Sequence, residues 1–347
     1  MAARRTDIWD YGSYPPMTTT ENARSLRGAA MGETATIVVG LGPVTSSVVQ
    51  PILGDKIRFV ADPTAAELSE AEGAIVRAAY VVDRTTLTSM PRLRVIARTG
   101  VGVELVDVAA AAERNIPVVV TPGSNTNAVA EGAFAHALHL VKRLGPLTSL
   151  VRSDRWDERT GYSIGDLEGS TIGIVGYGRI GRRVAELASA FGMIVIAYDP
   201  IASPPLEIAV SSLAQLAARA NVISLHVPLT PDTHHMIDTP MLSRLRPGTV
   251  LVNCGRGALV DLDAALDALS SGQLSGIGLD VFDPEPPQHH PIFDHPDVVL
   301  TPHVMGLSVR ATEATFIDAA RGIVDVLAGR IPAATAPVPD LQKELPA

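Results

Sequence analysis

Three glycines constrain this chain more than any other feature: Gly176, Gly178 and Gly181 stand in a G-x-G-x-x-G spacing between an apolar run and a helix-like segment. In this setting the first glycine permits a tight turn, the second lets a phosphate approach the backbone, and the third lets the helix pack closely on the strand. The next apolar run ends at Asp199, about 20 residues further on, where a carboxylate can bind both ribose hydroxyls and repel a 2′-phosphate. The segment therefore predicts a dinucleotide site that prefers NAD to NADP.

Short apolar runs alternate with helix-length segments on both sides of this motif. In the first series, strands are predicted at 36–41, 57–61, 79–83, 93–98 and 116–122. That series also contains a predicted helix over 64–73, and a long helix follows it from Asn127 to the helix breakers Gly145 and Pro146. In the second series, strands are predicted at 171–176, 194–199, 222–227, 249–254, 275–281 and 298–302. Because continuous apolar strands belong to sheets covered on both faces, the alternation predicts an α/β fold with parallel sheets in two domains.

Charge balance and cysteine content exclude several classes of protein. Lys and Arg total 28 against 37 Asp and Glu, a formal charge of −9 with no basic cluster to bind nucleic acid or an anionic membrane. Cys254 stands alone, and the adjacent pairs His234-His235 and His289-His290 are poorly placed to share a metal ion. No apolar window is long enough to span a membrane. The sequence predicts a cytoplasmic protein with no metal, nucleic-acid or membrane partner.

Three polar residues follow predicted strands of the second series. Arg256 follows LVNCG, Glu285 lies in DVFDPEPP, and His303 follows VVLTP. Ligands of open α/β sheets bind at the carboxyl ends of the strands, so these side chains are expected beside the cofactor. An arginine can bind a carboxylate, a histidine can donate a proton, and a glutamate can keep that histidine protonated. The three residues fit the reduction of a 2-keto acid.

At these residues the chain resembles the D-isomer specific 2-hydroxyacid dehydrogenase family, and within it the 3-phosphoglycerate dehydrogenase branch. The matching segments span about residues 75–325 and include IARTGVGVELVDV, TPGSNTNAVAEGAFA, GIVGYGRIG, HVPLTPDTHHMID, VNCGRGALVDLDAAL, GIGLDVFDPEPP and TPHVMG. The order and spacing of Arg256, Glu285 and His303 resemble the family's Arg-Glu-His triad. The resemblance implies two Rossmann-like domains, a flavodoxin-like substrate domain and an NAD-binding domain inserted into it, and a homodimer joined through the cofactor domains.

The order of elements and the resemblance together predict four parts of the chain. Residues 1–32 are expected to be a poorly ordered extension and residues 336–347 a tail. The substrate domain is expected to comprise residues 33–122 and 305–335, and the NAD-binding domain residues 123–304. The last helix is thus expected to return to the first domain.

The resemblance also implies ligand-binding residues. Those implied for NAD are Gly176, Gly178, Arg179, Ile180, Gly181, Asp199, His226, Val227, Pro228, Cys254, Gly255 and Asp280. Those implied for the substrate carboxylate are Arg256 and the backbone N–H groups of Gly100, Val101 and Gly102.

Two positions depart from the phosphoglycerate branch, which usually has Thr where Val101 stands and an Arg at or next to Asp83. Arg84, one residue on, is the candidate for binding a second anionic group. The expected activity is the NAD-dependent interconversion of a D-2-hydroxy acid and its 2-keto acid, with 3-phosphoglycerate or a related small anion as substrate. The alternatives are a hydroxypyruvate or glyoxylate reductase, and a non-catalytic NAD(H)-sensing protein resembling the C-terminal-binding corepressors.

Overall fold

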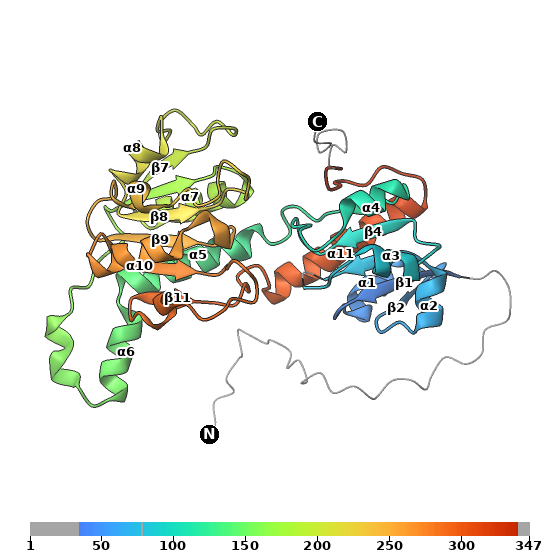
Figure 1. The fold of residues 1–347 in the computed structure, drawn as a ribbon, viewed down its shortest axis with the longest axis horizontal. Helices are drawn as coiled ribbons and strands as arrows, with labels where there is room; N and C mark the ends of the chain where they lie inside the picture. The colour runs from blue at the N-terminus through green and yellow to red at the C-terminus, as the bar shows by residue number, and fades with distance from the viewer. Residues whose placement is uncertain (1–34, 78, 339–347) are drawn as a thin grey trace, which may run out of the picture. The chain divides into compact units, whose positions relative to one another are not determined.

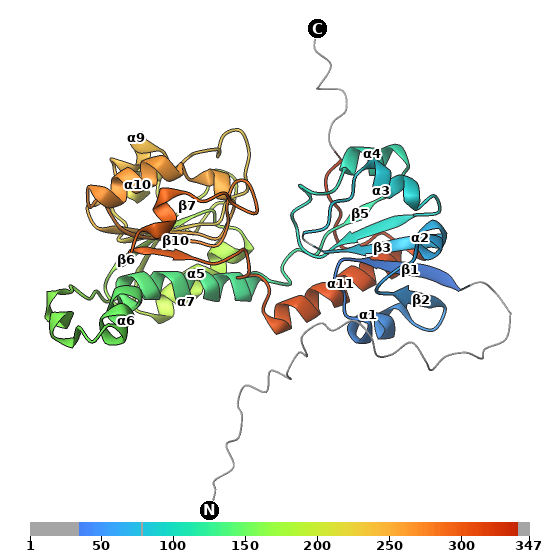
Figure 2. The ribbon, with the colours of Figure 1, turned by 60° about the horizontal axis from the view of Figure 1, so that its bottom comes forward.

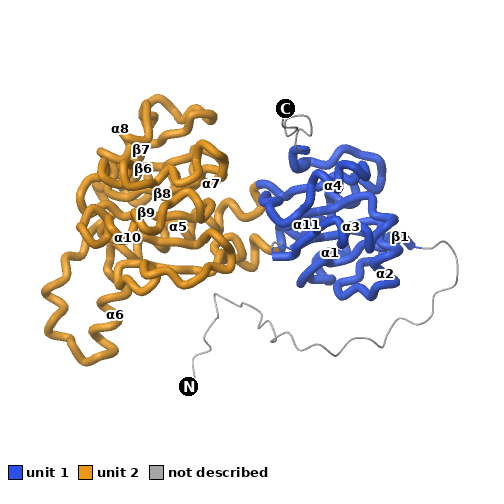
Figure 3. Tube along the Cα trace, in the orientation of Figure 1, with its two compact units in different colours: residues 1–122, 313–347 blue, residues 123–312 orange. Residues whose placement is uncertain are grey.

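The computed structural model describes residues 35–77 and 79–338 (Figure 1). The expectation for residues 1–32, and that for the tail beyond residue 338, lie outside the described residues. Contacts within the chain define two compact units: residues 1–122 together with 313–347, and residues 123–312 (Figure 3). The segment 305–312, predicted with the first domain, falls in the second unit.

The first unit is built on a parallel sheet of five strands in the order β2-β1-β3-β4-β5. Its strands are β1 Thr36–Leu41, β2 Ile57–Val60, β3 Ala71–Val76, β4 Val95–Arg98 and β5 Val118–Val119. Its helices are α1 Ser46–Leu53, α2 Ala65–Glu70, α3 Arg84–Ser89, α4 Val108–Glu113 and most of α11, Val309–Leu327. Helices α3 and α4 pack on one face of the sheet, and α1 and α11 pack on the other (Figure 2).

The central strand of this sheet is not where the sequence pattern predicts it. A helix is predicted over 64–73 and a strand over 79–83, but α2 passes directly into β3 at Ala71 with no linker. Nearly every side chain of β3 is buried, and a Cβ on Gly73 would lie 3.2 Å from Ile323 of α11. Burial on both faces favours the extended conformation here, so tertiary packing overrides the helical tendency of the Ala-Glu stretch.

The second unit contains a parallel sheet of six strands in the order β11-β10-β9-β8-β6-β7. Its strands are β6 Thr171–Val175, β7 Ile194–Tyr198, β8 Val222–Leu225, β9 Thr249–Asn253, β10 Leu274–Leu279 and β11 Val298–Leu300. Its helices are α5 Thr126–Val141, α6 Leu144–Arg152, α7 Arg179–Ala190, α8 Leu213–Ala217, α9 Thr239–Leu242 and α10 Leu262–Ser270, with 3-10 turns η1 Trp156–Gly161, η2 Gly257–Leu259 and η3 Pro291–Asp294. All six strands of the predicted second series are present.

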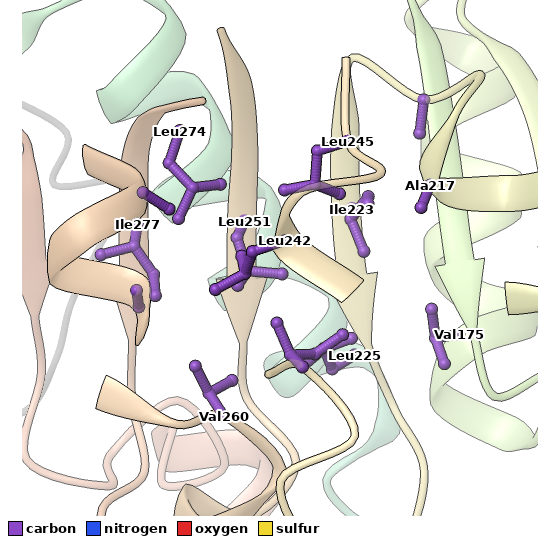
Figure 4. Close-up of a cluster of buried hydrophobic side chains, with 14 of the residues drawn as sticks. Val175, Ala217, Ile223, Leu225, Leu242, Leu245, Leu251, Val260, Leu274 and Ile277 are labelled. Atoms are coloured by element: carbon purple, nitrogen blue, oxygen red, sulfur yellow. The ribbon is translucent and has the colours of Figure 1, made fainter. Parts of the chain in front are cut away.

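Two apolar clusters, one on each face of this sheet, hold the second unit together. Leu225, Leu251 and Ile277 project from neighbouring strands into the cluster that α8, α9 and α10 cover (Figure 4). Helices α5 and α7 cover the opposite face, where Ile174 and Val252 are fully buried. Each buried side chain of this size contributes about 1.5–3 kcal/mol to folding. These clusters fix the sheet whose strand ends carry the predicted functional residues.

The long helix predicted to stop at Gly145 and Pro146 ends earlier. Helix α5 finishes at Val141, and Arg143 adopts a left-handed conformation with φ of 53°. Gly145 and Pro146 instead lie in the first turn of α6, where the missing N–H of proline costs no helical hydrogen bond. Glycine and proline therefore mark the start of the next helix here.

Candidate active site

The three glycines of the motif lie where β6 turns into α7. Gly176 has φ of 95°, and a Cβ there would lie 2.7 Å from the carbonyl oxygen of His226. A Cβ on Gly181 would lie 2.0 Å from the carbonyl oxygen of Gly176, so only glycine lets the helix approach the turn this closely. At Gly178 no atom of the described residues lies within 4 Å of a Cβ position. This open position, next to the first N–H groups of α7, fits a pyrophosphate.

Asp199 follows β7 and closes the turn beside the glycines. Its Oδ2 accepts a hydrogen bond from the N–H of Tyr177 at 2.7 Å, and its Oδ1 accepts from the N–H groups of Ile201 and Ala202 at 2.8 Å. These backbone donors hold the carboxylate in one orientation and leave acceptor capacity on Oδ2 for a ribose hydroxyl.

Replacing Asp199 with Ala is expected to weaken NADH binding about tenfold, since a hydrogen bond to a charged group is worth about 1.5–3 kcal/mol. The preference for NADH over NADPH should also shrink, because the charge that repels a 2′-phosphate is gone. Asp199→Asn is the matched control: it keeps an acceptor but loses the charge, so it should retain more NADH affinity than Ala while gaining NADPH affinity. Fluorescence titration gives both dissociation constants, and an unchanged ratio in the Ala variant contradicts the role.

The other residues implied for the cofactor lie at the same edge of the sheet. Those on the first turn of α7 are Arg179 and Ile180; those after β8, β9 and β10 are His226, Val227, Pro228, Cys254, Gly255 and Asp280. Nε2 of His226 lies 2.8 Å from Oγ of Ser224, while its buried Nδ1 has no partner among the described residues. Burial lowers the pKa of His226 to about 4, so the ring is neutral. The neutral His226 packs beside the glycine turn, where a Cβ on Gly176 would lie 2.7 Å from the carbonyl oxygen of His226.

Arg256, Glu285 and His303 follow β9, β10 and β11, three neighbouring strands. Nδ1 of His303 lies 2.8 Å from Oε2 of Glu285, and Oε1 of the same carboxylate accepts from the N–H of Phe282 at 3.0 Å. His303 has φ of 52°, a left-handed conformation uncommon for a residue with a side chain. The structure therefore pairs two of the three predicted catalytic side chains directly.

The electrostatics of this pair favour a protonated histidine. The hydrogen bond to Glu285 and the charge of that carboxylate raise the pKa of His303 above its ordinary value, against the opposing effect of burial. Burial alone would raise the pKa of Glu285, but hydrogen bonds from His303 and from the N–H of Phe282 outweigh it and lower that pKa. Both shifts favour an imidazolium held by a carboxylate, a form that can act as a proton donor.

Arg256 caps the turn η2, and its backbone is anchored from β9. Its carbonyl oxygen accepts from Nδ2 of Asn253 at 2.9 Å, and its Nη1 donates to the carbonyl oxygen of Gly255 at 2.8 Å. The positive charge of Arg256 lowers the pKa values of both Glu285 and His303, so the guanidinium acts electrostatically on the pair. The three residues thus form one electrostatically coupled group.

The loop after β4 carries the residues expected to bind a substrate carboxylate. The N–H of Gly100 donates to Oγ1 of Thr121 at 2.7 Å, and the carbonyl of Gly102 accepts from Nε of Arg98 at 2.9 Å. The N–H of Gly100 already has a partner in Thr121. The candidates for anion binding in this loop are therefore the backbone N–H groups of Val101 and Gly102. Sequence reasoning does not find Thr121, which lies 21 positions further along the chain.

Arg84 lies at the start of α3 in a network of acidic residues. Its Nη1 and Nη2 donate to the two carboxylate oxygens of Glu113 at 2.6 Å, and its Nε lies 3.7 Å from Asp107. This two-pronged ion pair raises the pKa of Arg84 further. A guanidinium held in this way is poorly suited to bind a substrate anion as well.

Arg77, which sequence reasoning missed, is the basic residue at the carboxyl end of β3. Its guanidinium lies over the ring of Phe316, 5.2 Å from the ring centre, and its side chain passes close to Gly42 after β1. Burial lowers its pKa, and no carboxylate of the described residues pairs with it. Once β3 is placed at 71–76, the strand-end rule points to Arg77 and away from Arg84.

Comparison with known proteins identifies relatives of both units. Residues 134–305 match the family model of the NAD-binding domain of D-isomer specific 2-hydroxyacid dehydrogenases. D-3-phosphoglycerate dehydrogenase of Mycobacterium tuberculosis is 40% identical over 287 residues, which cover 80% of this chain and 54% of that protein. Glyoxylate reductase of Thermococcus litoralis is 35% identical over 279 residues, covering 77% of this chain and 83% of that protein. The chain spans about half the length of the phosphoglycerate dehydrogenases it matches.

Solved structures share the whole two-unit fold. The TT0316 protein from Thermus thermophilus is 34% identical with a TM-score of 0.76, covering 87% of this chain and all of that one. D-lactate dehydrogenase from Aquifex aeolicus, solved with NAD and lactic acid, is 30% identical with a TM-score of 0.72, covering 85% of this chain and 96% of that one. The second unit is therefore an NAD-binding domain of the Rossmann type.

Proposed function

This chain belongs to the D-isomer specific 2-hydroxyacid dehydrogenase family, and we propose that it interconverts a D-2-hydroxy acid and the corresponding 2-keto acid with NAD as cofactor. The observation that carries the proposal is the 2.8 Å contact between Nδ1 of His303 and Oε2 of Glu285. Arg256 follows β9, the strand next to the one that Glu285 follows. Together they supply a proton donor, the carboxylate that keeps it protonated and a cation for the substrate.

In the reductive direction, Arg256 binds the carboxylate of the keto acid and polarises its carbonyl oxygen through the guanidinium fork. His303 donates the proton on Nε2 to that oxygen, because its Nδ1 is held by Glu285. NADH, when bound at the glycine turn, supplies the hydride. In the oxidative direction the neutral His303 accepts the hydroxyl proton at the same atom.

A second polar group of the substrate would define the substrate class, and of the two arginines considered in the first unit, Arg77 is the better candidate for binding an anion. Arg77 is half-buried and lies over an aromatic ring, whereas Arg84 is already held by Glu113. A partly desolvated guanidinium without a carboxylate among the described residues favours an anionic ligand. We therefore infer a small 2-hydroxy acid with a second anionic group, of which 3-phosphoglycerate is one example.

The test is kcat/KM with NADH for phosphohydroxypyruvate, hydroxypyruvate, glyoxylate and pyruvate. The doubly anionic acid should be preferred, and Arg77→Met should lower its kcat/KM about 100-fold, since truncating one partner of a charge pair costs about 2–5 kcal/mol. The same variant should leave kcat/KM for glyoxylate nearly unchanged. The matched control Arg84→Met should leave kcat/KM nearly unchanged for both substrates. Preference for hydroxypyruvate or glyoxylate would support the reductase alternative, and no turnover with any keto acid would refute the enzyme.

The pH dependence of the reaction should report the His303–Glu285 pair. Reduction needs the protonated His303, so kcat/KM for the keto acid should be full at low pH and fall as pH rises through the raised pKa, above 6.5. Glu285→Gln keeps a hydrogen-bond acceptor but removes the charge, and should move the midpoint to lower pH. Asp294→Asn, which unpairs the exposed His289, is the control and should not move it. An unchanged midpoint in Glu285→Gln would mean that another group titrates.

We also propose a homodimer. Helix α6 and the turn η1 extend away from the sheet of the second unit (Figure 1). They carry the large exposed apolar side chains of Leu144, Val151 and Trp156, and Ile164 in the loop after η1 is also exposed. An apolar patch of this kind favours an interface with another chain. Light scattering should give twice the mass of one chain, and Trp156→Glu should shift the distribution towards the monomer.

A cytoplasmic location is our inference from the single thiol. Cys254 is the only cysteine in the sequence, so it has no partner for an intramolecular disulfide. Burial raises the pKa of the Cys254 thiol, which keeps it protonated. No helix in residues 35–77 or 79–338 has the length and apolar character needed to cross a membrane.

A further inference from the structure

A buried chain of hydrogen bonds runs from helix α5 to the end of β10. His136 of α5 is 2% exposed, and its Nε2 lies 3.2 Å from Oγ1 of Thr301. That hydroxyl donates to Oδ1 of Asp280 at 2.6 Å, and Asp280 is also 2% exposed. Because a hydroxyl has one hydrogen and a carboxylate only accepts, the hydrogen of Thr301 is used on Asp280. Nε2 of His136 must therefore carry a proton and donate it to Thr301.

The environment of His136 keeps it neutral in this one tautomer. Its Nδ1 is buried with no partner among the described residues, so a second ring proton there would have no acceptor. Burial lowers the pKa of His136, and the charge of Asp280 only partly opposes this. A neutral histidine with a fixed N–H is a directional donor, whereas a leucine of similar volume would fill the same space without one.

Asp280, at the other end of this series of hydrogen bonds, holds the loop that carries His303. The carboxylate of Asp280 accepts from the N–H of Val304 at 3.0 Å and from that of Met305 at 3.2 Å. The carbonyl oxygen of Asp280 accepts from the N–H of His303 at 2.8 Å. Three consecutive N–H groups therefore depend on one residue, at the place where His303 adopts its left-handed φ of 52°. A left-handed residue persists only where its surroundings hold it.

Two glycines make room for this arrangement. A Cβ on Gly132, one helical turn before His136, would lie 2.4 Å from Sδ of Met305. A Cβ on Gly278 of β10 would lie 2.8 Å from Nδ1 of His136. On one face of α5, Gly132 thus leaves space for Met305 of the loop, and His136 on the next turn donates a hydrogen bond to Thr301.

We propose that His136 is a positioning residue for His303, which acts through Thr301 and Asp280 to fix the loop that carries the proton donor. The proposal rests on the proposed function insofar as His303 is the acid. The mechanism is indirect. The N–H of His136 orients the hydroxyl of Thr301, that hydroxyl orients the carboxylate of Asp280, and the carboxylate holds the N–H groups of Val304 and Met305, which directly follow His303.

Amide hydrogen exchange of residues 303–305 tests this without substrate. In His136→Leu, which keeps volume and removes the donor, exchange should rise about tenfold, the size expected when one hydrogen bond is lost. In His136→Gln, which can place an N–H near the position of Nε2, exchange should stay within about threefold of the wild type. His139→Leu, one turn on along α5 and half-buried, is the matched control and should change nothing in the loop.

Kinetics supply the second readout. His136→Leu should lower kcat about tenfold with little change in the dissociation constant of NADH, and His136→Gln should restore most of the loss. Thr301→Val removes the linking hydroxyl, so adding His136→Leu to it should cause no further loss if the two act in one chain.

The outcomes separate the two proposals. Unchanged loop exchange in His136→Leu, equal effects of Leu and Gln, or additive effects with Thr301→Val would overturn the positioning role. If His136→Leu does not fold, the comparison of His136→Gln with Thr301→Val and Thr301→Ser gives the same decision, since only the serine keeps the hydroxyl. A wild type that shows the expected exchange pattern but no turnover would refute the enzyme and leave the hydrogen-bond chain standing.

Discussion

Replacing His303 with Gln is expected to lower kcat for keto-acid reduction by about 10² to 10⁴, the usual contribution of a positioned general acid. Glutamine can still donate an N–H to Glu285, but it cannot transfer a proton to the developing alkoxide. The hydrogen bond to Glu285 raises the pKa of His303, which favours the imidazolium form that the proposed donor requires. The loss should therefore fall on kcat, measured as NADH oxidation at saturating keto acid, with a smaller effect on KM.

The control is a histidine of the same unit outside the strand ends. His289 is exposed and pairs with Asp294, so His289→Gln should retain wild-type kcat. NADH titration of His303→Gln should give a dissociation constant close to that of the wild type, because the glycine turn is untouched. If kcat survives in His303→Gln, the proton comes from water or another group and the proposed mechanism is wrong.

The cofactor turn is predictable from sequence because its causes are local. The positive φ of Gly176 and the 2.0 Å approach of a Cβ at Gly181 arise within one turn of chain, so the residue types alone point to the geometry. The strand ends that carry Arg256, Glu285 and His303 are also predictable, since each follows a continuous apolar run. The chemistry of a glutamate and a histidine at these strand ends also predicts their pairing; the structure adds its geometry, 2.8 Å between Nδ1 of His303 and Oε2 of Glu285.

The first unit is harder to predict because its packing competes with local tendencies. Residues 71–73 continue the helical pattern of the Ala-Glu stretch that forms α2, and burial in the centre of the sheet makes them the start of a strand instead. That single shift moves the strand end from Arg84 to Arg77 and changes the candidate for anion binding. The partner of Gly100 is missed for a related reason: Thr121 meets it only because β4 and β5 are neighbours.

The buried chain from His136 is beyond sequence reasoning altogether. A histidine on an apolar helix face is typical of core packing, and nothing in the sequence relates it to Thr301, 165 positions away. Its orphaned Nδ1 and the small residue Gly278 beside it become informative only when the side chains are placed. A positioning residue of this kind is identified only by assigning each buried donor to its acceptor in the folded chain.

Arg256→Ala should give the other large effect, a fall in kcat/KM of about 10² to 10³, because removing one partner of a charged pair costs about 2–5 kcal/mol. The loss should be shared between KM and kcat, since the guanidinium would bind the carboxylate in the ground state and polarise the carbonyl oxygen in the transition state. Arg256→Lys keeps the charge without the planar fork, so it should recover only part of the loss.

A second signature distinguishes this role from general damage to the site. The charge of Arg256 lowers the pKa of His303, so in Arg256→Ala the midpoint of the pH profile for reduction should move to higher pH while the maximum falls. Arg256→Lys should keep the midpoint near that of the wild type, because the positive charge remains. A variant that loses activity with the midpoint unmoved, or moved to lower pH, would place Arg256 outside the electrostatic field of the proton donor, and the proposed trio would reduce to the His303–Glu285 pair alone.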